Sequence, residues 1–513
     1  MKRALTSILA ALPLLLGSAL LSASVRAQEE VGNTFVYTNN NANPNTVTGF
    51  SVGPSGTLTM LPGTPVLTGG GGFGTFFASN TATATMRKNF LYVSNSGTND
   101  ISAFKIDTST GALMAVSGSP FATGGSGGVP GVPSGVSLAV TPNGRFLYAG
   151  NEGSGNISEF SIGSNGALTA VSGSPFNLGG APDGIKVTPN GKFLGVALPF
   201  LNSVAMLKIG SDGALTPAPG SPFPQGGAGA ASYVDMSCNS EQLFASLFNT
   251  TINNTQVAVS TIGHNGALIP ITGSPFTFSG GDSSVGVLTP DNQWLFVSNQ
   301  STSTITSLDV ESNGSLTQVN GSPFTDSTAI DPNGMATNRE GTLLYAANGS
   351  NSVTGFSIDS NGALSSVPLS PFITGGAGFL RSLTVFPANQ VEGEGDENGD
   401  DGHKGHFEFE GESKCGAHGE MEFEEGDPGG QKMEGSVDSM TVIGNTAMMS
   451  GSGTLLDGTP VQYTAVVLGN LPLIGANQFA ISWITLTGSV FNLTGSVFKT
   501  SGALTNGYIA VHP

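Results

Sequence analysis

The stretch Gly166-Ala167-Leu168-Thr169-Ala170-Val171-Ser172-Gly173-Ser174-Pro175-Phe176 decides the fold, because it recurs with variation along the chain. The glycine of its Gly-x-Leu part stands at seven positions separated by 55, 55, 47, 53, 48 and 48 residues: Gly56, Gly111, Gly166, Gly213, Gly266, Gly314 and Gly362. The proline of its second part repeats with the same six gaps, from Pro65 to Pro371. Because this glycine and this proline repeat with the same spacing, the repeat is not due to chance. A period near 50 residues is typical of the blades of a β-propeller.

Each repeat contains four strand-like pieces, which the third repeat shows most clearly. Val136–Val140 is an apolar run of the kind found in an inner strand, and Thr141-Pro142-Asn143-Gly144 has the residues of a tight turn. Phe146–Gly150 forms a second strand. Ile157–Ile162 alternates apolar and polar residues, as a strand with one buried face does, and Ala167–Val171 is the fourth strand.

The two ends of the repeat region complement each other. The chain begins the repeats at a second strand, Phe35-Val36-Tyr37-Thr38-Asn39, and a spare first strand, Ser382–Phe386, follows the seventh repeat. Pairing these two strands closes the ring and removes two open sheet edges. The sequence therefore predicts an all-β fold in which residues 33–388 form a seven-bladed β-propeller with four-stranded blades, closed by strand exchange.

The blade motifs resemble a known family. Leu91-Tyr92-Val93-Ser94-Asn95 and Thr141-Pro142-Asn143-Gly144-Arg145-Phe146-Leu147-Tyr148 are similar to the Tyr-Val-Thr-Asn repeat of the lactonase-like propellers, which include 6-phosphogluconolactonase-like proteins. The resemblance covers residues 33–388. It implies lactone chemistry by His, Arg and a carboxylate near the starts of inner strands. This chain departs from that pattern, because the propeller region contains one histidine, His264 in a turn, and only Arg381 stands at an inner-strand start.

Acidic residues collect near the expected inner-strand starts. They are Asp183, Asp235, Asp282 and Asp331, with Glu152 in a neighbouring loop. One interpretation is that they are solvated loop carboxylates or turn-capping aspartates. The other is a carboxylate-lined central pocket that binds a cation or sugar hydroxyls. We take these five residues and Arg381 as candidate ligand-binding residues and assign no catalytic residue.

A strongly acidic segment follows the propeller. Residues 391–427 hold 14 of the 35 acidic residues and only two lysines, so they contribute −12 of the net charge of −19. We expect residues 389–405 to be a flexible acidic linker because of their charge and glycine content. The excess of negative charge argues against nucleic acid as a partner, since its phosphates would be repelled.

Two patterns in this segment suggest a divalent cation, Ca²⁺ or Zn²⁺. Residues 396–402 are similar to a calcium loop, although the glycine is displaced by one place; the alternative is a solvated run of charge. His403, His406, Cys415 and His418 form two closely spaced pairs that would supply four tetrahedral zinc ligands on a hairpin. The alternative is an incidental polar hairpin.

Residues 406–513 are predicted to be a small β-sandwich or barrel. His406–Glu410 and Glu420–Glu424 alternate strictly between apolar and polar residues, which gives one apolar and one acidic face. The run from Gly444 to the closing Gly507–His512 resembles the small C-terminal β modules of secreted bacterial proteins, including the post-COAP type. That resemblance implies no activity.

Residues 1–27 have the pattern of a secretory signal. Lys2 and Arg3 precede an apolar run from Ile8 to Leu21, and Val25-Arg26-Ala27 offers a cleavage site. A membrane anchor is the alternative, but the run is short for a spanning helix of about 20 residues. We expect an exported protein, periplasmic or extracellular, without a transmembrane helix in the mature chain. Cysteines 238 and 415 lie in different predicted domains, and their pairing is left open.

Two functions follow from these patterns. The first is a non-catalytic binding or surface-associated protein whose partner is a carbohydrate or a cell-surface or extracellular protein. The alternative, which the family resemblance implies, is a hydrolase of sugar lactones. The lack of histidine and near lack of arginine at inner-strand starts favours the first, since lactone hydrolysis needs a base and an oxyanion donor.

Overall fold

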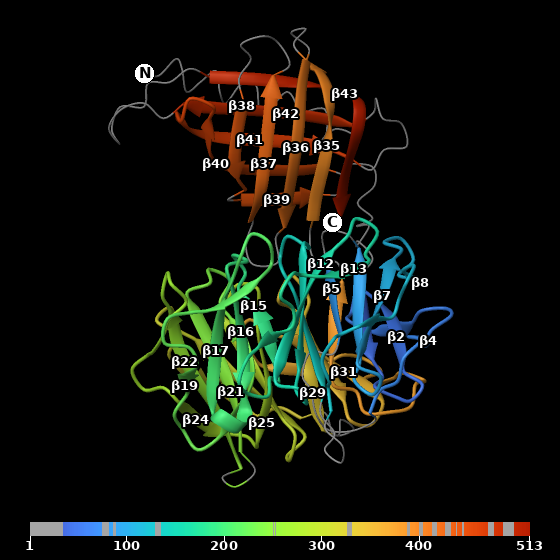
Figure 1. Ribbon diagram of the computed structural model, residues 1–513, viewed down its shortest axis with the longest axis vertical. Helices are drawn as coiled ribbons and strands as arrows, with labels where there is room; N and C mark the ends of the chain where they lie inside the picture. The colour runs from blue at the N-terminus through green and yellow to red at the C-terminus, as the bar shows by residue number, and fades with distance from the viewer. Residues whose placement is uncertain are drawn as a thin grey trace. The chain divides into compact units, whose positions relative to one another are not determined.

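The computed structural model describes residues 34–73, 82–85, 89–128, 135–249, 251, 253–325, 331–386, 390–399, 404–412, 418–425, 432–437, 439–443, 446–469, 477–485 and 497–512. These residues form seven small antiparallel sheets and one larger sheet (Figure 1). The signal sequence expected at residues 1–27 lies outside the described residues. Within the described part of the chain, no helix has the length and apolar character needed to span a bilayer.

The seven small sheets are the predicted blades, and their strands follow chain order from the inside outwards except in blade 1, whose innermost strand comes from the end of the propeller. Blade 1 contains β34 Leu383–Phe386, β1 Phe35–Asn39, β2 Thr46–Val52 and β3 Leu58–Met60. Blade 2 contains β5 Ala82–Thr85, β6 Phe90–Asn95, β7 Asp100–Ile106 and β8 Leu113–Ala115. Blade 3 contains β10 Val136–Val140, β11 Phe146–Asn151, β12 Asn156–Ile162 and β13 Leu168–Ala170. Blade 4 contains β15 Ile185–Val187, β16 Phe193–Leu198, β17 Ser203–Ile209 and β18 Leu215–Pro217.

The remaining three blades follow the same order. Blade 5 contains β20 Ala230–Met236, β21 Gln242–Phe248, β22 Asn254–Ile262 and β23 Leu268–Pro270. Blade 6 contains β25 Ser283–Leu288, β26 Trp294–Asn299, β27 Thr304–Val310 and β28 Leu316–Gln318. Blade 7 contains β29 Pro332–Thr337, β30 Leu343–Asn348, β31 Ser352–Ile358 and β32 Leu364–Ser366. A 3₁₀ turn, η1 Pro199–Leu201, joins β16 to β17 in blade 4.

Most blades also contain a fifth, short strand that the sequence pattern did not show. In blade 3 it is β14 Phe176–Asn177, which pairs with the start of β12. The others are β4 Val66–Leu67, β9 Phe121–Ala122, β19 Phe223–Pro224, β24 Phe276–Ser279 and β33 Phe372–Ile373. Blade 6 has a single bridge at the same place, between Ile305 and Phe324. The Pro-Phe of the repeat therefore turns the chain back onto its own blade before it crosses to the next.

Strand exchange closes the ring as predicted. The N-terminal β1 pairs antiparallel with β34 from the end of the propeller, with Phe35 opposite Phe386 and Thr38 opposite Leu383. The innermost strands β5, β10, β15, β20, β25, β29 and β34 pack side by side around the full circle. Their starting ends therefore meet around one central axis.

A tyrosine that recurs in the second strand of four blades explains why the Gly-x-Leu turn recurs along the chain. The hydroxyl groups of Tyr37, Tyr92, Tyr148 and Tyr345 are buried and donate hydrogen bonds to carbonyl oxygens of Gly111, Gly166, Gly213 and Gly56 at 2.7, 2.9, 3.0 and 2.8 Å. In every case the glycine belongs to the Gly-x-Leu turn of the next blade around the ring. The tyrosine of the second strand and the glycine of the Gly-x-Leu turn are thus the two ends of one inter-blade contact.

The turn glycine at this contact has no space for a side chain. Gly166 has φ +81°, and a Cβ added there would lie 2.5 Å from the ring of Phe90 in the preceding blade. Both the left-handed backbone and the close approach therefore require glycine. Within blade 3, the hydroxyl of Ser174 accepts the backbone N–H of Glu159 at 2.9 Å and holds the Gly-Ser-Pro-Phe segment against its own blade. The Ser174-Pro175 peptide bond is cis, as are the matching bonds of the other blades.

Two glycines allow the cost of this close approach to be measured. Gly173 has φ +91° and open space around its Cα, whereas Gly166 has a similar φ and contacts Phe90. We expect Gly173→Ala to cost about 1–2 kcal/mol for the left-handed backbone alone. Gly166→Ala should cost a further ~1–3 kcal/mol for the forced repacking. Chemical denaturation of both variants checks this, and equal losses would contradict the packing argument.

The C-terminal domain is one nine-stranded sheet. Its strands are β35 Gln390–Gly399, β36 Lys404–Glu412, β37 His418–Glu425, β38 Lys432–Ser436, β39 Ser439–Ile443, β40 Thr446–Leu455, β41 Pro460–Leu468, β42 Gln478–Thr485 and β43 Val497–His512. They follow the order β38-β37-β36-β35-β43-β42-β41-β40-β39, and β38 also pairs with β40, which closes the sheet on itself. Its core contains stacked rings, with Phe407 and Phe479 centred 4.2 Å apart. Of the two predicted forms, the structure has the barrel.

The flexible linker expected over 389–405 is wrong for residues 390–399. They form β35, which pairs with β36 and with β43 along its length. Gly393 and Gly395 are buried opposite Phe409 and Phe407, so the large rings of one strand cover the small residues of the other. The glycines that suggested flexibility are the inward face of a strand.

One cysteine is described. Cys238, in the turn between β20 and β21, is disulfide-bonded. Cys415 lies outside the described residues.

Candidate functional site

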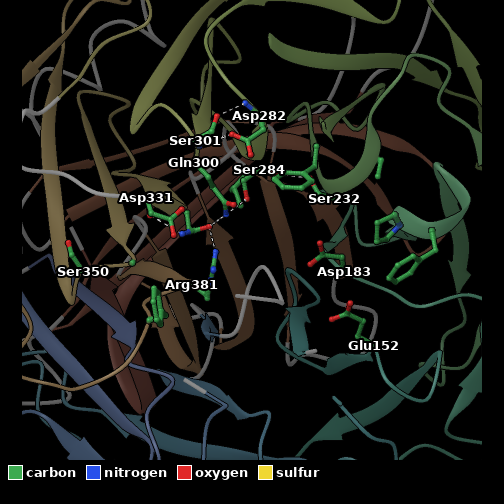
Figure 2. Close-up of a pocket in the computed structure, with 18 residues that line it drawn as sticks. Glu152, Asp183, Ser232, Asp282, Ser284, Gln300, Ser301, Asp331, Ser350 and Arg381 are labelled. Carbon is green, nitrogen blue, oxygen red and sulfur yellow. Dashed lines mark hydrogen bonds between the residues drawn. The ribbon is translucent and has the colours of Figure 1, made fainter. Parts of the chain in front are cut away.

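A pocket of about 770 Å³ lies where the innermost strands of the propeller begin. Its titratable lining residues are Glu152, Asp183, Asp282, Asp331 and Arg381 (Figure 2). Its neutral polar lining includes Ser232, Ser284, Gln300 and Asn333, and its aromatic lining is Phe200, Phe248 and Phe379. Among the described residues, six of the seven blades contribute, because the starts of their inner strands meet at the central axis. The pocket thus combines four carboxyl groups, one guanidinium and several apolar rings.

Five of the six candidate ligand-binding residues line this pocket, and Asp235 does not. Asp235 is near the far end of β20, which starts five residues earlier at Ala230. Its carboxylate accepts the backbone N–H groups of Met236 and Leu288 at 2.9 and 3.0 Å and pairs with Lys186 Nζ at 3.1 Å. Asp235 therefore ties blades 4, 5 and 6 together, and its role is structural.

Glu152 and Asp183 form a carboxyl pair on one side of the pocket, where Figure 2 shows them next to each other. Glu152 Oε2 accepts the backbone N–H of Gly135 at 2.9 Å. Burial and then the negative charge of Asp183 raise the pKa of Glu152 from 4.5 to about 8, against the opposing effect of Gly135. At neutral pH Glu152 is thus mainly a neutral acid beside a second carboxyl group.

Arg381 brings the positive charge of the pocket and is 3% exposed. Its Nη1 donates a hydrogen bond to Asn333 Oδ1, which also accepts from the side-chain amide of Gln300. Gln300 in turn donates to Ser284 Oγ at 3.1 Å. Burial lowers the pKa of Arg381, while the negative charges of Asp331 and Asp183 act in the opposite direction. The guanidinium is therefore held in place by amides and faces carboxylates on two sides.

Asp331 has an unusual backbone and an available oxygen. Its φ is +58°, a value that few residues other than glycine adopt, and its neighbour must be Gly349 because a Cβ there would lie 2.9 Å from Asp331 Oδ2. The Oδ1 atom is buried and has no hydrogen-bond donor among the described residues. Burial raises the pKa of Asp331, opposed by Arg381 and by hydrogen bonding to Asn333.

Asp282 is fixed more firmly than Asp331. It is 5% exposed, and its Oδ1 accepts the backbone N–H of Ser301 at 2.6 Å. Its own backbone carbonyl accepts the N–H of Gln300 at 3.2 Å. Asp282 therefore holds the loop that carries Gln300 into the pocket.

The proposed zinc ligands are not brought together. His403 and Cys415 lie outside the described residues. His406 pairs with Asp396 at 3.0 Å, and the register places His418 opposite Glu412, six residues along β36 from His406. At about 3.3 Å per residue the two histidines are roughly 20 Å apart, too far to share one ion.

The calcium-loop prediction for residues 396–402 is also not supported, because Asp396 to Gly399 lie in strand β35. Among the described residues there is no group of three or more His, Cys, Asp or Glu side chains placed to hold a metal.

Gln300 and Asn333, two neutral polar residues of the pocket, were not among the residues predicted from the sequence. A signal for one of them was present. Glu152 directly follows the asparagine that ends β11, and Gln300 follows the matching Asn299 of β26. The residue after the second strand thus faces the pocket in more than one blade, so repeat position identifies Gln300. Nothing in the local sequence distinguishes Asn333.

The raised pKa of Glu152 makes propeller stability depend on pH. The folded state holds a proton that the unfolded chain has lost, so stability falls as pH rises from about 4.5 to about 8. Glu152→Gln removes this pH-dependent loss of folding stability. The free energy of unfolding of the variant, relative to that of the wild type, should therefore increase as pH rises from about 4.5 to about 8. Each pKa unit is worth about 1.4 kcal/mol, and water at this half-buried site reduces the total to roughly 2–3 kcal/mol.

Denaturation midpoints measured at pH 5 and pH 8.5 check this effect. Glu311→Gln is the control, because Glu311 is exposed in the turn between β27 and β28. A Glu152→Gln variant whose stability relative to the wild type is the same at both pH values would show that Glu152 is ionised in the folded protein.

Comparison with known proteins agrees with this geometry. Residues 126–239 and 254–372 match a family model described as Lactonase, 7-bladed beta-propeller. No curated protein sequence matches the chain.

Solved structures with the same fold cover about the length of the propeller. A proposed 6-phosphogluconolactonase from Bacteroides fragilis is 18% identical over 71% of this chain and 100% of its own, with a TM-score of 0.56. The periplasmic gluconolactonase of Pseudomonas aeruginosa is 16% identical over 69% of this chain and 99% of its own, with a TM-score of 0.55. At these identities the likeness concerns the fold.

Proposed function

Because residues 126–239 and 254–372 match the family model of the seven-bladed lactonase propellers, we propose that the central pocket hydrolyses lactones. The observation that carries this proposal is the meeting of three groups in one pocket: the Glu152 acid, the neighbouring Asp183 carboxyl and the Arg381 guanidinium. Ester hydrolysis needs a base for water, a positive group for the oxyanion and an acid for the leaving oxygen. The pocket contains one group suited to each task.

The groups act in sequence. Asp183 takes a proton from water, whose oxygen forms a bond to the lactone carbonyl carbon. Arg381 stabilises the negative oxygen of the tetrahedral intermediate. The ring C–O bond then breaks, and Glu152 gives its proton to the leaving oxygen, which becomes a hydroxyl group. The product is a hydroxy acid, and the proton on Asp183 returns to the ionised Glu152.

The charge of the pocket helps the reaction to finish. A lactone is neutral and its hydrolysis product is an anion at neutral pH. Four carboxyl groups face one guanidinium in the lining, so the pocket repels the product more than the substrate. Product release is thereby favoured.

The hydrolase is better supported than the non-catalytic binding protein that the sequence analysis favoured. The family description and the lactonase names of two proteins with the same fold point to this chemistry. The lack of histidine at the inner-strand starts does not deprive the pocket of an acid. The raised pKa of Glu152 supplies an acid that works near neutral pH without histidine.

Turnover of a lactone panel by the purified protein tests the proposal, with proton release as the readout. We expect kcat/KM to fall as pH rises above about 8, because Glu152 then loses the proton that the leaving oxygen needs. Glu152→Gln should lower kcat by about 100-fold or more. Glu311→Gln is the matched control and should keep full activity. A Glu152→Gln variant that hydrolyses lactones at the wild-type rate would show that Glu152 is not the general acid.

We also propose that the protein is exported, on the basis of the signal pattern in residues 1–27. Cell fractionation and N-terminal sequencing test this proposal. The exported protein should begin at Gln28, and an intact Met1 in the cytoplasmic fraction would refute it.

A further inference from the structure

The charges around the central pocket are strongly unbalanced. Four carboxyl groups and one guanidinium line it, a net of three formal negative charges, or two while Glu152 carries its proton. The one cation, Arg381, already faces Asp331 and Asp183. A phosphate group entering this pocket would meet like charge and find no cation without an acidic neighbour among the described residues.

The segments that precede the inner strands and lie outside the described residues contain no positively charged side chain. Residues 74–81, 129–134 and 326–330 contain no lysine or arginine. Arginine and lysine are the side chains that bind phosphate groups most strongly. The chain therefore supplies no phosphate-binding cation from these segments.

The neutral groups of the pocket suit hydroxyl groups. Asp331 Oδ1 is buried without a hydrogen-bond donor among the described residues, which leaves an acceptor for a donor from the ligand. Ser284 and Gln300 line the same side. Phe200 is 79% exposed at the rim, and Phe379 is half-buried, so each offers an apolar face for the carbon skeleton of a sugar ring.

We propose that the pocket selects uncharged lactones that carry several hydroxyl groups, rejects phosphorylated lactones, and uses Asp331 to accept a substrate hydroxyl. This inference rests on the proposed lactone hydrolysis. Selection has two separate causes. The ring of carboxyl groups acts against phosphate over several ångströms, whereas Asp331 acts through a direct hydrogen bond. The two causes respond differently to salt and to mutation.

Three substrates separate these causes in the full-length protein. They are D-glucono-1,5-lactone, its 6-phosphate, and δ-valerolactone, which has the same ring without hydroxyl groups. We expect kcat/KM for glucono-1,5-lactone to exceed that of each of the other two by at least about tenfold. Raising NaCl to about 0.5 M should reduce the discrimination against the phosphate at least about threefold, because salt screens charge. It should leave the discrimination against δ-valerolactone within about twofold.

Two variants test the residues, and a third serves as the control. Asp331→Asn removes one negative charge. It should reduce the kcat/KM ratio of glucono-1,5-lactone to its 6-phosphate, and that of glucono-1,5-lactone to δ-valerolactone, each at least about threefold. Ser350→Lys adds a cation at the exposed rim of the pocket, where folding is not at risk, and should raise the phosphate-to-neutral ratio at least about fivefold. Asp359→Asn removes a negative charge from an exposed turn after β31 and should change neither ratio.

Each outcome supports or overturns the inference. Preference for the 6-phosphate would overturn it while leaving lactone hydrolysis intact. Equal turnover of δ-valerolactone and glucono-1,5-lactone would overturn the role of the hydroxyl groups. If no lactone is hydrolysed, the proposed function fails, and calorimetry with glucono-1,5-lactam and its 6-phosphate decides the ligand class. Tighter binding of the uncharged lactam supports the inference, and no binding or tighter binding of the phosphate overturns it.

Discussion

The hydrogen bond from a buried tyrosine hydroxyl to a glycine carbonyl of the next blade is the contact on which the ring depends. It joins Tyr92 to Gly166 and recurs around the propeller. In blade 6, where phenylalanine takes the place of tyrosine, Ser307 Oγ donates to the carbonyl of Gly362 at 2.6 Å instead. A buried carbonyl without a donor would be costly, so blade 6 keeps a donor to this carbonyl although its tyrosine is lost.

This contact also prepares the pocket. Among the described residues, such a hydrogen bond joins blade 1 to 2, 2 to 3, 3 to 4, 6 to 7 and 7 to 1, and it limits how far the inner strands of these blades can move apart. Glu152, Asp183, Asp331 and Arg381 come from four different blades and owe their proximity to that rigid ring. The motif that recurs most faithfully thus has no chemistry of its own. The chemistry lies in residues that differ from one blade to the next.

The C-terminal domain shows how composition can mislead. Glycine and acidic residues in β35 have the composition of a flexible chain, yet Gly393 and Gly395 pair with Phe409 and Phe407 and complete a closed sheet. Composition averages over both faces of a strand, whereas packing depends on each face separately. The zinc pattern failed for a related reason, since spacing along the chain does not show which residues the register places opposite each other.

Local and periodic signals in the sequence were enough to determine the seven blades, their phase and the closure by strand exchange. They also pointed to five of the pocket residues, because the starts of the inner strands and the loops beside them are visible as turn residues. The placement of Asp235 at the far end of β20, the neutral acid at Glu152 and the amide network of Asn333 and Gln300 were decided only by the tertiary structure. Burial and the approach of charges from other blades set these properties, and both depend on residues far apart in the chain.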